Sequence, residues 1–359
     1  MATPATPDEL DFALVAALQA SPRATWRRIG ETLRVSAQTA TRRWARLNEA
    51  GLAWQTCHAR QMGSGSPATA VIEVDCVPGR LPAVAAAIAE DPHVHSINHV
   101  SGSRDLLVIA GFVDHAALAR YVGFRLKHLE GVTAVRSHPA TFHADGSRWR
   151  LDQVLEPHSS LRHRAGQRNA VAAASKTPDA EDLAIIAALN EDCRQSLAAL
   201  SLRTDLPTKT VERRLARLEA NRAIVYRCDI ARASFGWRIG AFVWATAPPE
   251  QIPQVVGLLS GLREVRTCAS LSGPNNLMLA VWLRSLSDLD AIESQLNRRM
   301  PGLVVTDRAV TLWTIKLGGQ LVDVDGRYLR SVPVAPWRMD GVANAEKTFV
   351  EHLQARPWN

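Results

Sequence analysis

Two stretches of twelve residues decide the fold, because they align with each other without a gap. The first is Ser36-Ala37-Gln38-Thr39-Ala40-Thr41-Arg42-Arg43-Trp44-Ala45-Arg46-Leu47, and the second is Pro207-Thr208-Lys209-Thr210-Val211-Glu212-Arg213-Arg214-Leu215-Ala216-Arg217-Leu218. In the first stretch Ala40, Trp44 and Leu47 recur at helical spacing. A serine or a proline opens each stretch, and both residues favour the start of a helix. The pattern therefore predicts one helix that occurs twice.

The internal repeat extends over most of the chain. Asp11 matches Asp182, which is an offset of 171 residues (182 − 11). The same offset relates further pairs, namely Leu18 and Leu189, Gly65 and Gly236, Pro82 and Pro253, and Gly131 and Gly302. A register held over this length indicates two tandem copies of one unit.

Each unit is expected to begin with three short helices. In the first copy they are predicted at residues 8–20, 24–33 and 36–47, with a turn at Arg34-Val35 before the third. This arrangement is typical of a helix-turn-helix domain, here expected to be winged-helix-like.

The second part of each unit alternates strands and helices in the order βαββαβ. The first copy has strand patterns at 68–76, 94–100, 105–112 and 132–142, with helices at 81–89 and 116–127. The second copy has strands at 239–247, 265–271, 277–283 and 303–317, with helices at 252–262 and 286–300. This order is the ferredoxin-like motif, so the fold class is α+β. The two ferredoxin-like units are expected to pack sheet against sheet.

The predicted domain boundaries follow from these patterns. Helix-turn-helix domains are expected at residues 5–60 and 178–232, and ferredoxin-like domains at 66–145 and 237–325. A basic linker that matches nothing in the other copy spans 146–177. A C-terminal tail follows at 326–359, with a short helix predicted near 343–354 and no assigned role.

Composition narrows the class of protein. The net charge is +7 and the pI about 9.5, which favours a polyanionic partner. The five cysteines are scattered without C-x-x-C spacing, which argues against a disulfide framework or a zinc site and for a reducing compartment. No apolar run approaches the roughly 20 residues of a membrane span. We therefore expect a cytoplasmic protein without membrane association.

The repeated helix is a candidate DNA reader. Short hydrogen-bonding side chains in its first turn, followed by arginines, suit a helix that enters the major groove. The alternative is a solvated basic helix face. The candidate DNA-contacting residues are Ser36, Gln38, Thr39, Thr41, Arg42, Arg43 and Arg46 in the first copy, and Thr208, Lys209, Thr210, Glu212, Arg213, Arg214 and Arg217 in the second. Because the two sets differ, the half-sites need not be palindromic.

The chain resembles the leucine-responsive regulatory protein / AsnC family of transcriptional regulators. The resemblance is carried by Leu10-Asp11 with Leu18, by the repeated Arg-Arg-x-x-Arg-Leu of residues 42–47, and by the Ser-Gly-x-x-Asp-Leu loop at 101–106. It covers residues 5–145 and 176–320. It implies a sequence-specific DNA-binding regulator whose ferredoxin-like domain senses an amino acid or other small molecule and forms oligomers. The family usually has one unit per chain and pairs two chains, so this chain would be a fused pseudo-dimer.

The resemblance also implies an effector site at the Ser-Gly loops. Its candidates are Ser101, Gly102, Ser103, Arg104 and Asp105, with Ser272, Gly273, Asn275 and Asn276 in the second copy. Asn276 stands where the first copy has Asp105, so a charge is lost there. The plainer alternative for each loop is a β-turn. A second departure is Arg222, which stands where the first copy has Gly51.

Other functions are weighed against the regulator. Some relatives that pair two such units resemble sirohaem decarboxylases, which would place histidines and arginines in a tetrapyrrole pocket between the units. Residues 234–244 supply Arg238 but no histidine, which favours the regulator. His93, His95 and His99 alternate along a strand, but surface histidines are favoured over a metal site. No catalytic residue and no cofactor is expected, and one head acting only in partner contact is a further alternative.

Overall fold

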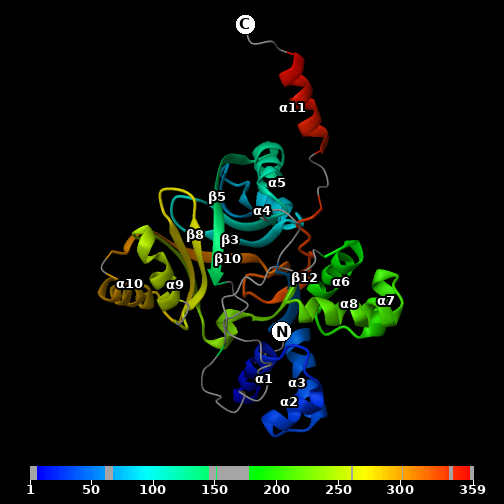
Figure 1. Cartoon of the computed structure of the whole chain (residues 1–359). Helices are drawn as coiled ribbons and strands as arrows, with labels where there is room; N and C mark the ends of the chain where they lie inside the picture. The colour runs from blue at the N-terminus through cyan, green and yellow to red at the C-terminus, as the bar shows by residue number, and fades with distance from the viewer. Residues whose placement is uncertain are drawn as a thin grey trace.

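The computed structural model describes residues 6–60, 68–144, 178–259, 262–300, 302–338 and 343–355, together with Leu151. Apart from Leu151, the predicted basic linker lies outside the described residues. The chain forms two small helical heads, a large strand-rich body and a C-terminal helix that projects from the body (Figure 1). None of the helices in the described ranges combines the length and apolar character needed to cross a membrane.

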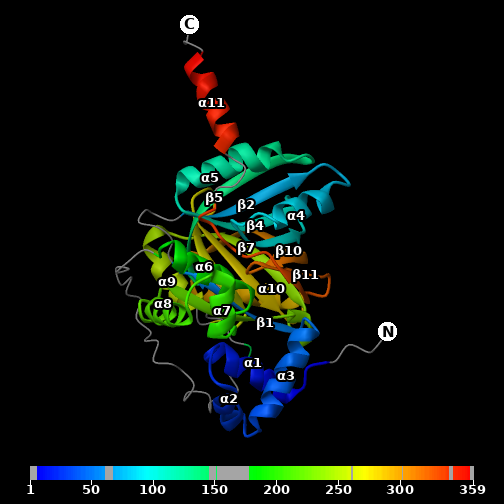
Figure 2. The ribbon, with the colours of Figure 1, turned by 90° about the vertical axis from the view of Figure 1, so that its right-hand side faces the viewer.

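Each head consists of three helices, as the repeat predicts. The first head contains α1 (Glu9–Ala20), α2 (Trp26–Leu33) and α3 (Ala37–Glu49), and the second contains α6 (Ala180–Glu191), α7 (Leu197–Thr204) and α8 (Thr208–Ala220). Asp8 and Asp11 form a capping box that starts α1, and Asp179 and Asp182 repeat it for α6. The Ser36 hydroxyl caps α3 by accepting from the Thr39 amide at 3.0 Å. The first head lies below the body in Figure 1, and the second head lies next to it, beside the lower part of the body (Figures 1 and 2).

A two-stranded ribbon that the sequence analysis did not predict joins the heads. It consists of β1 (Ala53–Ala59) and β6 (Ile224–Ile230), which pair antiparallel. Thr56 lies opposite Arg227, which is its own counterpart in the repeat, so the pair sits on a local two-fold axis. Cys57 of β1 packs in the core of the second head, and Cys228 of β6 packs in the core of the first. The two units therefore exchange strands.

The body is built from the two predicted ferredoxin-like units. The first contains β2 (Ala68–Cys76), α4 (Leu81–Ala89), β3 (Val94–Val100), β4 (Leu106–Phe112), α5 (His115–Arg120) and β5 (Val132–Ala144). The second contains β7 (Ile239–Thr246), α9 (Ile252–Leu259), β8 (Val265–Leu271), β9 (Leu277–Leu283), α10 (Ser287–Arg299) and β10 (Val304–Leu317). This confirms the βαββαβ order of both copies.

Eight described strands of the body close into a barrel. The order around it is β3-β4-β2-β5-β8-β9-β7-β10, and β10 closes the ring because it pairs with both β7 and β3. The sheets face each other across the barrel, as expected, but they are also hydrogen-bonded at both edges. Closure removes the unpaired edge groups that an open sheet would expose.

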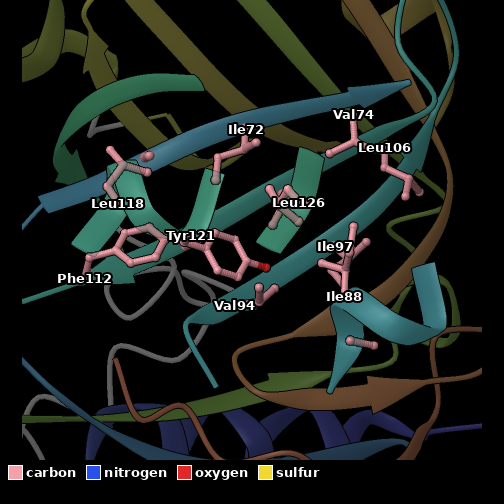
Figure 3. Packing of buried hydrophobic residues seen from close by; sticks show 14 of the residues in the cluster. Ile72, Val74, Ile88, Val94, Ile97, Leu106, Phe112, Leu118, Tyr121 and Leu126 are labelled. Atoms are coloured by element: carbon pink, nitrogen blue, oxygen red, sulfur yellow. The ribbon is translucent and has the colours of Figure 1, made fainter. Parts of the chain in front are cut away.

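Both faces of the central strands are buried. For this reason the sequences of these strands are continuous apolar runs. In β2, Ile72 and Val74 face α4 and α5 (Figure 3). Val71 faces the barrel interior instead. Phe242 and Trp244 of β7 meet Val71 there from the second unit. Alternate side chains along a strand point to opposite faces, so both sets must be apolar when helices cover the outside.

The predicted helix at 116–127 is less regular than expected. After α5 it continues as a π-helical turn (Tyr121–Arg125) and a 3-10 turn (Leu126–His128). Tyr121 donates to the Asp91 carboxylate at 2.8 Å, and Arg125 bonds the same carboxylate at 3.2 Å. The wider turn thus brings two side chains onto one acceptor.

The C-terminal tail runs back across the molecule before it leaves. In the structure the tail is the chain that follows β10, and it therefore begins before the predicted boundary at residue 326. It contains β11 (Gln320–Val322), β12 (Tyr328–Ser331) and the projecting helix α11 (Ala343–Ala355). The Tyr328 amide donates to the Gly51 carbonyl of the first head at 2.9 Å. The Val334 amide donates to Asn190 of the second head at 3.0 Å. The tail therefore ties both heads to the body.

Candidate functional site

The recognition helices α3 and α8 present matching exposed faces. The exposed positions are Ser36, Gln38, Thr41 and Arg42 on the first head, and Thr208, Lys209, Glu212 and Arg213 on the second. Thr39 and Thr210 are half-buried in the first turn. The opposite faces pack into the head cores through Ala40 and Leu47, and through Val211, Leu215 and Leu218.

The predicted DNA-contacting arginines fall into two classes. Arg43 bonds Asp8 at 2.7 Å and Asp11 at 3.0 Å, and Arg46 also bonds Asp11, which is fully buried. These arginines therefore fasten α3 to α1. The hydrogen bond from Arg43 lowers the pKa of Asp8.

The second head repeats this anchor. Arg214 bonds Asp179 at 2.8 Å and Asp182 at 2.9 Å, and Arg217 bonds Asp182. By contrast, Arg42 and Arg213 are exposed and form no ion pair with the described part of the chain. One arginine of each Arg-Arg pair is thus available to a ligand, while the other holds the helix.

The predicted effector loops are engaged in contacts within the chain. The Asp105 carboxylate accepts from the Cys76 amide at 2.7 Å, and the Asn276 amide oxygen accepts from the matching Ala247 amide at 3.0 Å. Both side chains hold the C-terminal end of the first strand of their ferredoxin-like unit, β2 or β7. An amide oxygen can do this as well as a carboxylate, which explains why asparagine replaces aspartate in the second copy.

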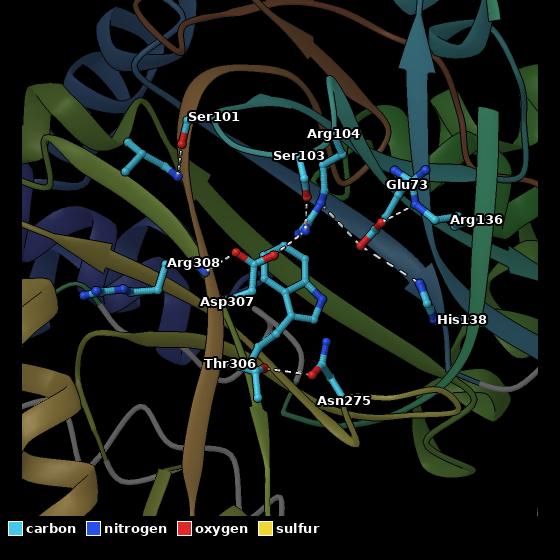
Figure 4. A network of polar contacts seen from close by, with 12 residues as sticks. Glu73, Ser101, Ser103, Arg104, Arg136, His138, Asn275, Thr306, Asp307 and Arg308 are labelled. Atoms are coloured by element: carbon cyan, nitrogen blue, oxygen red, sulfur yellow. Dashed lines mark hydrogen bonds and ion pairs between the residues drawn. The ribbon is translucent and has the colours of Figure 1, made fainter. Parts of the chain in front are cut away.

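Arg104 of the first loop points into the barrel rather than to solvent (Figure 4). Its guanidinium lies 3.4 Å from Glu73, contacts Asp307 of the second unit and stacks 4.1 Å from the Trp244 ring. The matching Asn275 accepts from the Thr306 hydroxyl at 2.8 Å.

The rest of the two loops also faces the other unit. The Ser101 hydroxyl accepts from the Val310 amide at 2.9 Å, and Ser103 bonds Arg104. The Ser272 carbonyl lies 3.3 Å from His138 of the first unit, beside Gly273. Gly102 has a positive φ of 98° at its turn. The structure thus places the two loops at the seams between the sheets.

A cavity of about 550 Å³ opens between the barrel, the ribbon and the tail. We call it the inner cavity. Its basic lining residues are His58, Arg60, His95 and His143 from the first unit, and Arg227, Arg232 and Arg266 from the second. Phe142, Phe242 and Trp282 form its aromatic walls, and Val322, Val334 and Trp337 of the tail complete it.

One buried carboxylate organises two of these arginines. Asp229 bonds Arg227 at 3.1 Å and Arg266 at 2.8 Å. Burial alone would raise the pKa of Asp229, but the two guanidinium groups outweigh it and lower that pKa to about 2. Arg266 also stacks 4.0 Å from the Trp282 ring.

His93, which directly precedes β3, and His95 of β3 do not share a face, although alternation along a strand predicts that they would. His93 stacks on Phe112 with ring centroids 5.1 Å apart on the helix-covered side, whereas His95 lies beside His58 at the inner cavity. A bulge between Val94 and Ser96 shifts the register of β3 and breaks the alternation. Across the described ranges, no three His, Cys, Asp or Glu side chains are grouped so that they would hold a metal ion.

Comparison with known proteins shows the family. The Lrp/AsnC ligand binding domain matches residues 69–142 and 240–321, and the AsnC-type helix-turn-helix domain matches residues 8–48 and 179–219. An uncharacterised HTH-type transcriptional regulator of Pyrococcus abyssi is 30% identical over 142 residues, which are 39% of this chain and 89% of the relative. The chain belongs to the Lrp/AsnC family. With two helix-turn-helix domains, this Lrp/AsnC protein is a DNA-binding transcription regulator.

Two further similarities bear on the architecture. An uncharacterised HTH-type regulator of Pyrococcus horikoshii is 28% identical over the same length, again 39% of this chain. Each of these relatives thus matches one unit's length of this chain. The crystal structure of the siroheme decarboxylase NirDL aligns with 97% of this chain and 100% of its own, with a TM-score of 0.57 and 11% identity. That likeness shows that the two-unit fold of this Lrp/AsnC protein also occurs elsewhere.

Sequence reasoning missed the inner cavity. Its residues come from the ribbon, the barrel mouth and the tail, none of which carries a contiguous motif. One signal was present, because His58 and Arg227 lie in the strands that follow the recognition helices, and Arg60 comes directly after the first of these strands.

Proposed function

We propose that this Lrp/AsnC-family regulator grips a single DNA duplex with both heads, as a fused pseudo-dimer. The observation that supports the proposal is the matched pair of α3 and α8. Each is anchored by a buried aspartate and exposes its first turn and one unpaired arginine. Heads of this kind read half-sites about one DNA turn, ~34 Å, apart.

The two heads would read different sequences. Gln38 and Thr41 of α3 correspond to Lys209 and Glu212 of α8. Glutamine pairs well with adenine, whereas lysine favours guanine and glutamate accepts from the cytosine amine. The operator is therefore expected to have two unlike half-sites.

The experiment is selection of bound sequences from random DNA, followed by gel-shift titration on the selected site. Arg42→Ala and Arg213→Ala should each weaken binding about ten-fold or more and lower the slope of affinity against salt by about one. Arg80→Ala is the charge-matched control, because Arg80 is exposed beside Glu130 on the body. Unchanged DNA affinity in the Arg42→Ala/Arg213→Ala double variant would contradict the proposal. If only one of the single variants lost DNA affinity, DNA binding would be restricted to that head.

A second candidate is an enzyme that acts on a carboxylated tetrapyrrole. The observation that favours it is the inner cavity, which combines histidines of the first unit with arginines of the second. The siroheme decarboxylase of similar fold has been solved with an iron-uroporphyrin III analogue. An absorbance scan of this chain with sirohaem tests the idea. A shifted Soret-type band and loss of carbon dioxide from the substrate would support it, and an unshifted spectrum would reject it.

A further inference from the structure

The described lining of the inner cavity contains basic side chains and no acidic ones. Four arginines line it, and within the described residues no Asp or Glu belongs to its lining. Asp229 offsets one charge of the Arg227–Arg266 pair. Arg232 donates to the carbonyl oxygens of Trp237 and Arg238, and burial lowers its pKa. Arg232 is half-buried, and a partly desolvated cation that donates to carbonyl oxygens is stabilised when an anion binds beside it.

The remaining walls suit an apolar body of moderate size. Phe142, Phe242 and Trp282 contribute aromatic surface, and the volume of about 550 Å³ lies within the range of ordinary small-molecule sites. Apolar walls with a few charged groups typically bind an organic ion by its body and orient it by its charge. The first unit supplies the histidines and the second supplies three arginines, so the site is complete only when both units are joined.

The walls of the inner cavity connect directly to the recognition helices. His58 lies on β1, which begins four residues after the end of α3, and Arg227 lies on β6, which begins four residues after the end of α8. The tail supplies Val334, whose amide bonds Asn190 of the second head. An occupant would therefore touch both strands that set the relative position of the heads.

We infer that the inner cavity is the effector site of this regulator, that it binds an aromatic or polycyclic carboxylate, and that its occupant sets the spacing of the two heads on DNA. The inner cavity is distinct from the two Ser-Gly loops. These loops lie where the sheets of the two units meet, and their side chains are bonded to other parts of the chain. The control of DNA binding rests on the proposed function, whereas the binding of the carboxylate does not.

Fluorescence of anilinonaphthalene sulfonate, an aromatic anion, tests the binding. Naphthoate should displace this probe at a concentration about ten-fold or more below that of naphthalenemethanol, and naphthylmethylamine should not displace it, because only the anion pairs with the arginines. Arg232→Gln should weaken probe binding about ten-fold or more. Arg284→Gln is the control of equal charge, since Arg284 is exposed and stands outside the inner cavity.

A second variant covers the case in which Arg232→Gln does not fold. Ala280→Phe keeps every charge but fills the space, because Ala280 lines the inner cavity, and it should abolish probe binding. Equal displacement by the three naphthalenes, or probe binding unchanged in both variants, would overturn the inference.

Measurements of DNA affinity with and without naphthoate distinguish failure of the effector site from failure of the proposed DNA binding. On the selected operator, saturating naphthoate should change the affinity of the wild-type chain at least about three-fold and leave Arg232→Gln unchanged. Probe binding without any change in DNA affinity would overturn the control of the heads. Absence of DNA binding would defeat the proposed function while leaving the carboxylate site standing.

Discussion

At the scale of single residues, the two copies of the repeat act as internal controls for each other. Gly51 and Arg222 occupy matching positions after the recognition helices, and both have a positive φ, 66° and 53°. A Cβ on Gly51 would lie 2.7 Å from the Tyr328 carbonyl oxygen of the tail. The first copy therefore keeps glycine because the tail docks there, while the second copy tolerates a side chain.

We predict that Gly51→Ala destabilises the protein by about 1–3 kcal/mol, because it adds left-handed strain and a clash with β12. Arg222→Gly is the matched variant, and it should change the free energy of unfolding by less than about 1 kcal/mol. Urea denaturation of both variants measures this. A Gly51→Ala variant as stable as the wild type would show that the tail does not pack against the first head.

Asp229 gives a pH-dependent prediction. Its pKa in the folded chain, about 2, is below its ordinary 3.8, so its stabilising effect is present above about pH 4 and is lost as the pH falls toward 2. Asp229→Asn should therefore cost about 2–4 kcal/mol at neutral pH, and the gap to wild type should narrow below about pH 4. Asp290→Asn, on an exposed aspartate, is the control. A gap that stays constant down to about pH 2 would contradict this account.

At the scale of elements, the tail is the segment whose role the sequence did not suggest. Val332, Val334 and Ala335 are buried, and Asn190 of the second head accepts from the Val334 amide. The segment up to Val334 therefore belongs to the folded core, although it lies mostly beyond the ferredoxin-like repeat. By contrast, α11 exposes Phe349, Val350 and Leu353.

We predict that two truncations differ sharply. Ending the chain after Leu317 should lower the midpoint of thermal unfolding by more than about 10 °C, because it uncovers several apolar side chains and breaks bonds to both heads. Ending it after residue 342, which removes α11, should lower the midpoint by only a few degrees. Differential scanning calorimetry of the two chains provides the measurement, and similar midpoints would refute the difference.

At the scale of the whole molecule, the chain behaves as a dimer whose subunits are linked. Gln19 donates to the Cys228 carbonyl, and its counterpart Asn190 donates to the Cys57 carbonyl, so each head bonds the strand of the other unit. The barrel likewise needs strands of both units. Because every strand of the barrel is paired on both sides, a second chain cannot join at a barrel strand, and the expected homo-oligomer would need another surface.

We predict that residues 1–145 alone do not form a stable monomer. This fragment would leave β3 and β5 as open edges and expose interior residues such as Val71 and Leu107, so it should dimerise or aggregate. Refolding this fragment together with residues 178–359 should give a complex that contains one copy of each fragment. Analytical ultracentrifugation distinguishes these states. A monodisperse, cooperatively unfolding monomer of the first fragment would show that the units are independent.

The sequence by itself determined the local structure and the repeat. Helix caps and the apolar periodicity of each element are short-range signals, and the offset between Asp11 and Asp182 compares the chain with itself. Together they predicted the helices of the heads, the strands and helices of the ferredoxin-like units and the tandem copies, but not the strands of the ribbon or of the tail. They also identified the exposed face of the recognition helices. They did not separate Arg42 from Arg43, because which arginine meets Asp11 depends on how α3 crosses α1.

The tertiary structure alone decided how the units join. Ribbon pairing and barrel closure bring together residues more than a hundred positions apart, such as Thr56 with Arg227 and Thr141 with Ser270. The periodicity of a strand does not show which other strand will pair with it. Strands pair through backbone N–H and C=O groups, and these are the same in nearly every residue. For this reason the inner cavity, whose charge is assembled from both units and the tail, was visible only once the chain was folded.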